Sequence, residues 1–239
     1  MIQVNSSAKV KIFSDGADTK EMIEMAQLPY IQGLTTNPTL MKKSGITNYE
    51  KFALEVLSEI KNKPISFEVF SDDFDEMETQ AKKIASWGEN VYVKIPVSNT
   101  LGEPTSVLIN KLTSHGIKVN VTAVMSINQV KTILKNLNPQ TPNYISIFAG
   151  RIADTGRDPM PIMIDALNQI KEFPSTELIW ASPRELLNVI QADQINCHII
   201  TATKDILNKL SLIGKSLEEY SLETVKMFRN DAIQANYAL

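Results

Sequence analysis

Lys94 is a residue that could do chemistry, because it lies in the apolar stretch Val91-Tyr92-Val93-Lys94-Ile95-Pro96. β-Branched and aromatic residues dominate this stretch, which is typical of a strand buried on both faces. An apolar site disfavours an ammonium ion, and a neutral lysine amine can attack a carbonyl to form a Schiff base. The alternative is a structural lysine that snorkels to the surface or pairs with a carboxylate.

Polar residues also stand at or near the ends of other apolar stretches. Seven of the eight strands expected below carry one or two of them: Asp15, Asn37, Glu68, Lys94, Asn120 with Thr122, Ser146 with Arg151, and Ser182 with Arg184. Each has an ordinary structural explanation, such as helix capping by Asp15 or a surface ion pair between Arg151 and Asp154. Their convergence at the carboxyl ends of parallel strands favours a functional site.

The elements that would position these residues alternate between strand and helix. Strands are expected at 10–14, 30–34, 65–70, 91–96, 117–123, 144–149, 178–181 and 195–201. A first helix is expected at about 19–27, and one long helix is expected after a turn at 35–38. Further helices are expected at 74–87, 105–115, 127–137, 161–172, 183–192 and 204–210. Eight such units predict a parallel sheet closed into a barrel rather than an open doubly wound sheet. The predicted fold is α/β, a single (β/α)8 TIM barrel over residues 1–239.

The two ends of the chain fall outside this repeat. Residues 1–9 are expected to form a polar tail, and 215–239 a C-terminal helical extension. Its apolar positions are Leu222, Val225, Phe228, Ala232 and Ala235. This helix either covers the barrel's own helices or lies at a subunit interface, and a homo-oligomer is expected.

Composition excludes several classes of function. Of 239 residues, 43% are hydrophobic and 21% charged, and a net charge of −3 gives no reason to expect nucleic acid. The lone cysteine, Cys197, and two histidines predict neither a disulfide framework nor a transition-metal site. No stretch approaches transmembrane length and no basic leader precedes an apolar core, so a cytoplasmic protein without membrane contact is expected.

A phosphate site is predicted around Ser182-Pro183-Arg184-Glu185. This S-x-x-E pattern is typical of a capping box with proline at the first helical position, and a helix N-terminus binds anions. Arg184 and Arg151 could add charge-assisted bonds. If Ser182 caps its own helix, however, its hydroxyl is less free for phosphate. The alternative is a capped helix with solvated arginines.

Five motifs in order resemble the transaldolase family. They are Leu34-Thr35-Thr36-Asn37-Pro38, Val93-Lys94-Ile95-Pro96, Val119-Asn120-Val121-Thr122, Ser146-Ile147-Phe148-Ala149-Gly150-Arg151 and Ala181-Ser182-Pro183-Arg184. The resemblance runs from Phe13 to about Leu210, and the chain length resembles the small branch that includes fructose-6-phosphate aldolases.

The resemblance implies a carrier of a three-carbon dihydroxyacetone unit between sugar phosphates, with no metal or other cofactor. Lys94 matches the Schiff-base lysine, and Asp15 the base that takes the C4 hydroxyl proton. Glu68 with Thr122 matches the pair that works through water during carbinolamine dehydration. The implied substrate-binding residues are Thr36, Asn37, Asn120, Ser146, Phe148, Arg151, Ser182 and Arg184, with Asn120 as a support behind the others.

Three functions remain open on the sequence: a transaldolase, an aldolase that releases free dihydroxyacetone, and a barrel that only binds a sugar phosphate. The aldolase branch typically has glutamine at the position of Glu68 and tyrosine at that of Phe148, so both residues favour transaldolase. The implied donors are sedoheptulose 7-phosphate or fructose 6-phosphate, and the acceptors glyceraldehyde 3-phosphate or erythrose 4-phosphate. The segments 98–100 and 154–159 match no characterised subgroup and could alter acceptor preference.

Overall fold

Eight parallel strands pair in sequence order, and β8 pairs back with β1, in a computed structural model that describes residues 9–238. The strands are β1 (Lys11–Asp15), β2 (Ile31–Thr35), β3 (Ile65–Glu68), β4 (Val91–Pro96), β5 (Val119–Val124), β6 (Asn143–Ile147), β7 (Thr176–Trp180) and β8 (Ile199–Thr203). The predicted (β/α)8 TIM barrel is therefore confirmed. The polar tail expected at 1–9 lies, apart from Lys9, outside the described residues.

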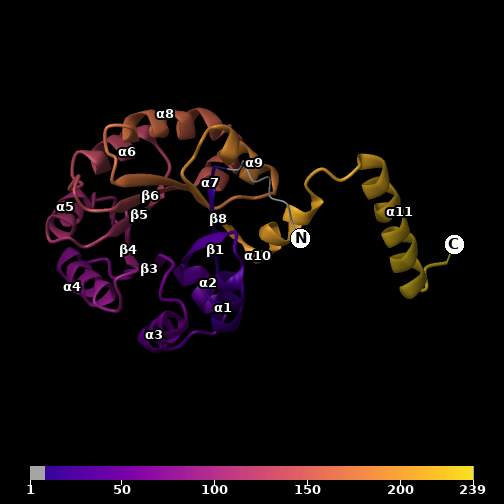
Figure 1. Cartoon of the computed structure of the whole chain (residues 1–239), viewed down its shortest axis with the longest axis horizontal. Helices are drawn as coiled ribbons and strands as arrows, with labels where there is room; N and C mark the ends of the chain where they lie inside the picture. The colour runs from indigo at the N-terminus through magenta and orange to yellow at the C-terminus, as the bar shows by residue number, and fades with distance from the viewer. Residues whose placement is uncertain (1–8, 239) are drawn as a thin grey trace.

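Helices surround the strands on the outside of the barrel (Figure 1). They are α1 (Thr19–Gln27), α2 (Pro38–Lys43), α3 (Tyr49–Glu59), α4 (Phe74–Ala85), α5 (Ser106–Ser114), α6 (Ile127–Leu134), α7 (Ala149–Ala153), α8 (Met160–Ile170), α9 (Leu187–Gln194) and α10 (Lys204–Leu207), followed by a 3-10 turn (Asn208–Leu212) and α11 (Leu217–Gln234). Side-chain caps start several of them. Asp18 and Asn48 accept backbone N–H bonds at the starts of α1 and α3, and Ser126 with Gln129 forms a capping box on α6.

The prediction of a single long helix after the turn at 35–38 is wrong. Asn37 caps α2 with Pro38 at its first position, but α2 ends after six residues and α3 begins at Tyr49. Gly45 between them has φ +71°, a left-handed conformation that glycine adopts without a steric penalty. The short helix α7 after β6 was also not predicted.

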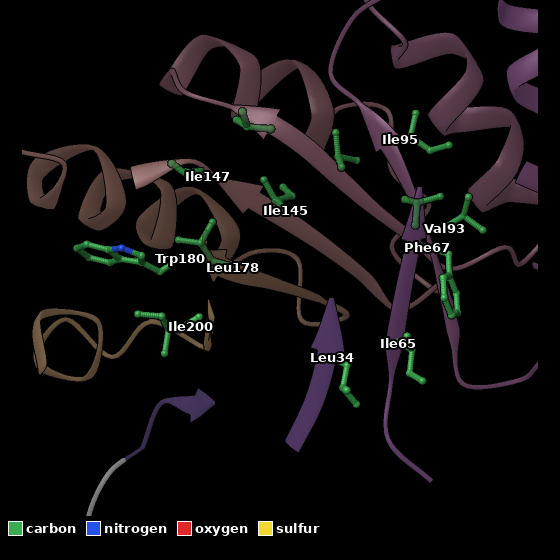
Figure 2. Packing of buried hydrophobic residues seen from close by; sticks show 14 of the residues in the cluster. Leu34, Ile65, Phe67, Val93, Ile95, Ile145, Ile147, Leu178, Trp180 and Ile200 are labelled. Atoms are coloured by element: carbon green, nitrogen blue, oxygen red, sulfur yellow. The ribbon is translucent and has the colours of Figure 1, made fainter. Parts of the chain in front are cut away.

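Alternation along the strands separates two layers of side chains. On β4, Val93 and Ile95 point outward to the helices, as do the other labelled residues in Figure 2. Tyr92 and Lys94 have the opposite parity and face the barrel interior. Burying an isoleucine such as Ile95 in the outer layer stabilises the fold by about 1.5–3 kcal/mol.

Aromatic rings fill the lower part of the barrel interior. The rings of Tyr92 and Tyr144 stack at 4.0 Å, and Phe13 meets Tyr144 edge-on at 6.0 Å. A Cβ atom on Gly33 would lie 2.4 Å from the Phe13 ring, so the glycine leaves room for that ring. Because Lys94 lies two residues beyond Tyr92, it stands one layer above this floor, toward the carboxyl ends of the strands.

Helix α11 leaves the barrel and extends away from it (Figure 1). None of its residues is buried, so it does not cover the barrel's own helices, which was one of the two alternatives considered. No helix within residues 9–238 is long and apolar enough to cross a membrane. The same residues contain no group of three or more His, Cys, Asp or Glu side chains that could hold a metal ion.

Candidate active site

A cavity of about 470 Å³ opens at the carboxyl ends of the strands. Its walls include these predicted residues: Asp15, Asn37, Glu68, Lys94, Thr122, Ser146, Phe148, Arg151, Ser182 and Arg184. A larger hollow of about 570 Å³ lies at the other end of β7 and β8, near Thr176 and His198, and contains none of the predicted residues. The smaller cavity is therefore the candidate site, because reactive groups converge there.

Lys94 is 5% exposed and reaches this cavity from β4. Its Nζ atom donates to Glu68 Oε2 at 2.8 Å and to the Thr36 carbonyl oxygen at 2.7 Å. Glu68 and Lys94 are register partners on β3 and β4, which places their side chains next to each other. Lys94 is thus both ion-paired and part of the cavity, and a carboxylate able to accept its proton lies in contact.

Asp15 is the second buried acid of the site. Its Oδ1 accepts from Thr35 Oγ1 at 2.8 Å and its Oδ2 from Asn37 Nδ2 at 3.4 Å. Burial raises the pKa of Asp15 above its ordinary value of 3.8, while the Lys94 charge and the Thr35 hydrogen bond oppose the shift. A raised pKa makes the ionised carboxylate a stronger base, which suits a group that takes up a proton and later returns it.

Strand β8 supplies polar groups that were missed in the sequence. Thr201 and Thr203 both line the cavity. The Thr35 hydroxyl lies 2.6 Å from the Thr201 hydroxyl, and because Thr35 donates to Asp15, Thr201 must donate to Thr35. The predicted strand ended at 201, two residues before β8 does, and the next helix was expected from 204, so Thr203 fell in neither element.

Two predicted substrate-binding residues do not reach the cavity. The Asn120 side chain is fully buried, donates to Ser66 Oγ at 3.0 Å and accepts from Ser146 Oγ at 2.7 Å. It thus lies behind Ser146 and hydrogen-bonds to it. Thr36 is buried as well and donates its hydroxyl to the Ser66 carbonyl at 3.0 Å, so it offers its backbone oxygen to Lys94 and no side chain to the cavity.

Thr122 presents an unsatisfied hydroxyl. Its Oγ1 is buried and has no hydrogen-bond partner among the described residues, although Thr122 lines the cavity. Buried hydroxyls rarely remain unpaired, since losing hydration costs free energy. A water molecule or a ligand in the cavity can supply the missing partner.

The capping box predicted at Ser182 is wrong. Ser182 has φ +57°, and α9 begins only at Leu187 without a side-chain cap. The Asn188 Oδ1 atom already accepts the backbone N–H groups of Arg184 at 2.8 Å and Glu185 at 3.2 Å. These N–H groups are therefore not available to an anion, and the Ser182 hydroxyl is not used as a helix cap.

The two arginines still stand on one side of the rim. A Cβ atom on Gly150 would lie 1.7 Å from the Ser182 carbonyl oxygen, so the absence of a side chain lets the start of α7 approach the segment that follows β7. Arg151 follows Gly150, with its guanidinium 5.7 Å from the centre of the Phe148 ring. Arg184 forms a two-point ion pair with Asp154, with Nε 3.1 Å from Oδ1. A carboxylate thus occupies the donor edge that could bind two phosphate oxygens.

The family described as "Transaldolase/Fructose-6-phosphate aldolase" has a model that matches residues 12–239. A "Probable transaldolase" of Nitrosopumilus maritimus is 34% identical over 204 residues, covering 84% of this chain and 87% of the relative. One from Dehalococcoides mccartyi is 34% identical over 202 residues, with 84% and 90% covered. One from a Thermoanaerobacter species is 32% identical over 218 residues, with 91% and 95% covered.

A solved structure shares the fold at much lower identity. It is described as "Crystal structure of a putative lyase/mutase from Burkholderia cenocepacia J2315", with a TM-score of 0.57 and 10% identity. The match covers 95% of this chain and 85% of that one. At this identity the likeness supports the barrel architecture alone.

Proposed function

Because this chain belongs to the transaldolase/fructose-6-phosphate aldolase family, we propose that it is a transaldolase that transfers a dihydroxyacetone unit through a Schiff base on Lys94. The observation that carries the proposal is the contact between a buried lysine and a carboxylate at the base of the rim cavity. The relatives' names support the reaction class, and the steps below follow from the side chains of the site.

Imine formation begins with the transfer of the Lys94 ammonium proton to Glu68, 2.8 Å away. The free amine attacks the ketose C2 carbonyl, and the carbinolamine then loses its hydroxyl as water. Glu68 returns a proton to that leaving hydroxyl through a water molecule, and the unpaired Thr122 hydroxyl holds this water. The product is an iminium ion, which can accept an electron pair.

Carbon–carbon cleavage uses Asp15. Its carboxylate takes the C4 hydroxyl proton, the C3–C4 bond breaks, and the bonding pair moves to the iminium to give an enamine. The first aldehyde then leaves. A second aldehyde accepts the enamine pair at its carbonyl carbon, and Asp15 returns the proton to the new hydroxyl. Hydrolysis of the imine frees Lys94 and completes the transfer.

The substrates proposed are sugar phosphates. Sedoheptulose 7-phosphate or fructose 6-phosphate would donate the three-carbon unit, and glyceraldehyde 3-phosphate or erythrose 4-phosphate would accept it. Two guanidinium groups and a hydroxyl on one side of the rim suit a phosphate: Arg151, Arg184 and Ser182. The phosphate would replace Asp154 as the partner of Arg184. Asn37 and Ser146 line the deeper cavity and suit the hydroxyls of the dihydroxyacetone fragment.

The alternative is an aldolase that releases free dihydroxyacetone. Transfer and release both end with hydrolysis of an imine, but release of dihydroxyacetone first requires protonation of the enamine carbon, and this step needs a positioned proton donor. Phe148 offers a ring without a hydroxyl on the cavity wall, which favours an enamine that waits for the acceptor aldehyde.

One assay separates the two activities. Fructose 6-phosphate is supplied with and without erythrose 4-phosphate, and sedoheptulose 7-phosphate and free dihydroxyacetone are quantified. A transaldolase forms sedoheptulose 7-phosphate only with the acceptor and releases little dihydroxyacetone. If dihydroxyacetone is released as fast as it is transferred, the enzyme is an aldolase and the transaldolase proposal fails.

We also propose that the enzyme is a homo-oligomer in which α11 of one copy packs on another. Large apolar residues of α11 are 48–79% exposed: Leu217, Tyr220, Leu222, Val225, Met227, Phe228 and Ile233. A surface this apolar on one helix is typical of an interface. Sedimentation should give an oligomer for the wild type and a smaller species for Val225→Glu/Phe228→Glu, with Lys226→Glu as control. A monomeric wild type would contradict this assembly.

A further inference from the structure

The end of β3 leaves two backbone groups of Glu68 without a strand partner. Pairing between β2 and β3 ends with Thr35 opposite Ser66, where the Thr36 N–H donates to the Ser66 carbonyl at 3.1 Å. Residues two apart in a strand point their N–H and C=O groups to the same side. The backbone N–H and C=O groups of Glu68 therefore point to the β2 side, where β2 no longer pairs with β3. The Val69 N–H points to the opposite side and donates to the Lys94 carbonyl oxygen at 3.1 Å.

One side chain from α3 satisfies both groups. The Tyr49 hydroxyl donates to the Glu68 carbonyl oxygen at 3.0 Å and accepts from the Glu68 N–H at 2.7 Å. A single hydroxyl thus replaces the missing strand at this residue.

The Tyr49 ring is itself fixed by its neighbours. It makes edge-on contacts with Phe67 at 6.3 Å and with Trp87 at 5.5 Å. Burial raises the pKa of the Tyr49 hydroxyl, so the hydroxyl keeps the proton that it donates to Glu68. Tyr49 connects a rigid aromatic cluster to the last residue of β3.

We propose that Tyr49 is a positioning residue that holds the Glu68 carboxylate against Lys94 for imine formation. The inference rests on the proposed Schiff-base reaction and adds a residue outside the cavity's polar walls. The Glu68 side chain starts from the backbone that Tyr49 fixes and ends 2.8 Å from Lys94 Nζ. Displacement of a catalytic group by about 1 Å can slow a reaction about a hundredfold.

Tyr49→Phe tests the proposal because it removes only the hydroxyl and keeps the ring. We expect imine formation with fructose 6-phosphate, trapped by borohydride in a single turnover, to slow about ten- to a hundredfold. The value of kcat should fall similarly while KM changes less than about twofold, because Arg151 and Arg184 are untouched. Tyr92→Phe is the matched control, since Tyr92 is a partly buried tyrosine in the barrel interior, stacked on Tyr144 one layer below Lys94. The Tyr92→Phe enzyme should form the borohydride-trapped adduct at the wild-type rate.

A second variant separates hydrogen bonding from packing. Para-aminophenylalanine at position 49 keeps the ring and places an amine, which can donate to the Glu68 carbonyl, where the hydroxyl was. We expect it to retain most of the wild-type trapping rate. Tyr49→Phe trapping as fast as wild type, or equal losses in Tyr49→Phe and the amine variant, would overturn the positioning role. Absence of any adduct in the wild type would instead overturn the Schiff-base proposal itself.

Discussion

Lys94 Nζ lies 2.8 Å from Glu68 Oε2 because the two residues are register partners on β3 and β4 and both side chains face the barrel interior. The pair is mostly buried, with 6% and 17% of the two side chains exposed. Such a contact satisfies the buried lysine and, in the proposed reaction, provides the acceptor for its proton when a ketose binds.

Glu68→Ala should impair both stability and catalysis. Removing one partner of a buried pair leaves a poorly compensated charge, and we expect a loss of about 3 kcal/mol in the free energy of unfolding. Imine formation should slow about a hundredfold or more, because the proton acceptor is gone. Urea unfolding and single-turnover trapping measure the two effects. Glu50→Ala is the control, since its exposed ion pair with Lys83 should contribute about 1 kcal/mol or less. Equal effects of the two substitutions would contradict the assignment.

Asp15→Asn should separate imine formation from bond cleavage. The amide keeps an acceptor for Thr35 but cannot take the C4 hydroxyl proton. Transfer should fall about a hundredfold or more, while borohydride still traps the fructose 6-phosphate adduct. Loss of both trapping and transfer would show that Asp15 does not act at the cleavage step.

The same substitution has a pH-dependent effect on stability. Burial raises the pKa of Asp15 in the folded state above 3.8, so ionisation opposes folding as pH rises from about 4 through the raised value. Below that window the carboxyl group is protonated in both states and the penalty is absent. Asp15→Asn should therefore stabilise the protein more at pH 8 than at pH 4, which urea unfolding at the two pH values measures. A gain that is larger at pH 4 would have the wrong sign.

Arg151→Ala and Arg184→Ala should weaken binding of phosphorylated ketoses and spare unphosphorylated ones. Each loss should be about 1.5–3 kcal/mol if the guanidinium makes a charge-assisted bond to phosphate. KM values for fructose 6-phosphate and for fructose provide the comparison. Arg157→Ala is the matched control, because Arg157 donates to Thr155 on the same loop and does not line the cavity. Equal losses on both ketoses would show that phosphate is not the partner.

Phe148→Tyr should convert part of the transfer activity into release. The new hydroxyl can position the water and proton that free dihydroxyacetone requires, at nearly the same side-chain volume. Acceptor-free cleavage of fructose 6-phosphate should rise by at most about a hundredfold while transfer falls. An unchanged ratio of release to transfer would remove Phe148 as the basis for distinguishing the two activities.

The barrel and most of the site could be predicted because both depend on local patterns. Successive side chains of a strand point to opposite faces, so the positions of Lys94 and Val93 in β4 turn the first inward and the second outward. The same alternation could have excluded Thr36 from the predicted substrate-binding residues, since Thr36 directly follows Thr35, whose side chain faces inward. Asn120 has inward parity but lies behind Ser146, which depends on packing between strands.

The remaining errors arose where distant contacts override a local signal. Ser182 fits an S-x-x-E pattern, but the approach of Gly150 and the side chain of Asn188 set a different backbone there. Tyr49 carries no sequence signal for its contact with Glu68, because the contact depends on where β2 ends relative to β3. Such relationships become visible only after the strands are in register.

Identification of the lysine that forms the covalent intermediate tests the central claim most directly. The wild-type enzyme is incubated with fructose 6-phosphate and sodium borohydride, digested, and mapped by mass spectrometry. We expect one reduced dihydroxyacetone adduct, located on Lys94, together with loss of activity. Lys94→Ala should give no adduct and no transfer. An adduct on Lys42, Lys204 or another lysine, or transfer activity without Lys94, would contradict the proposed mechanism.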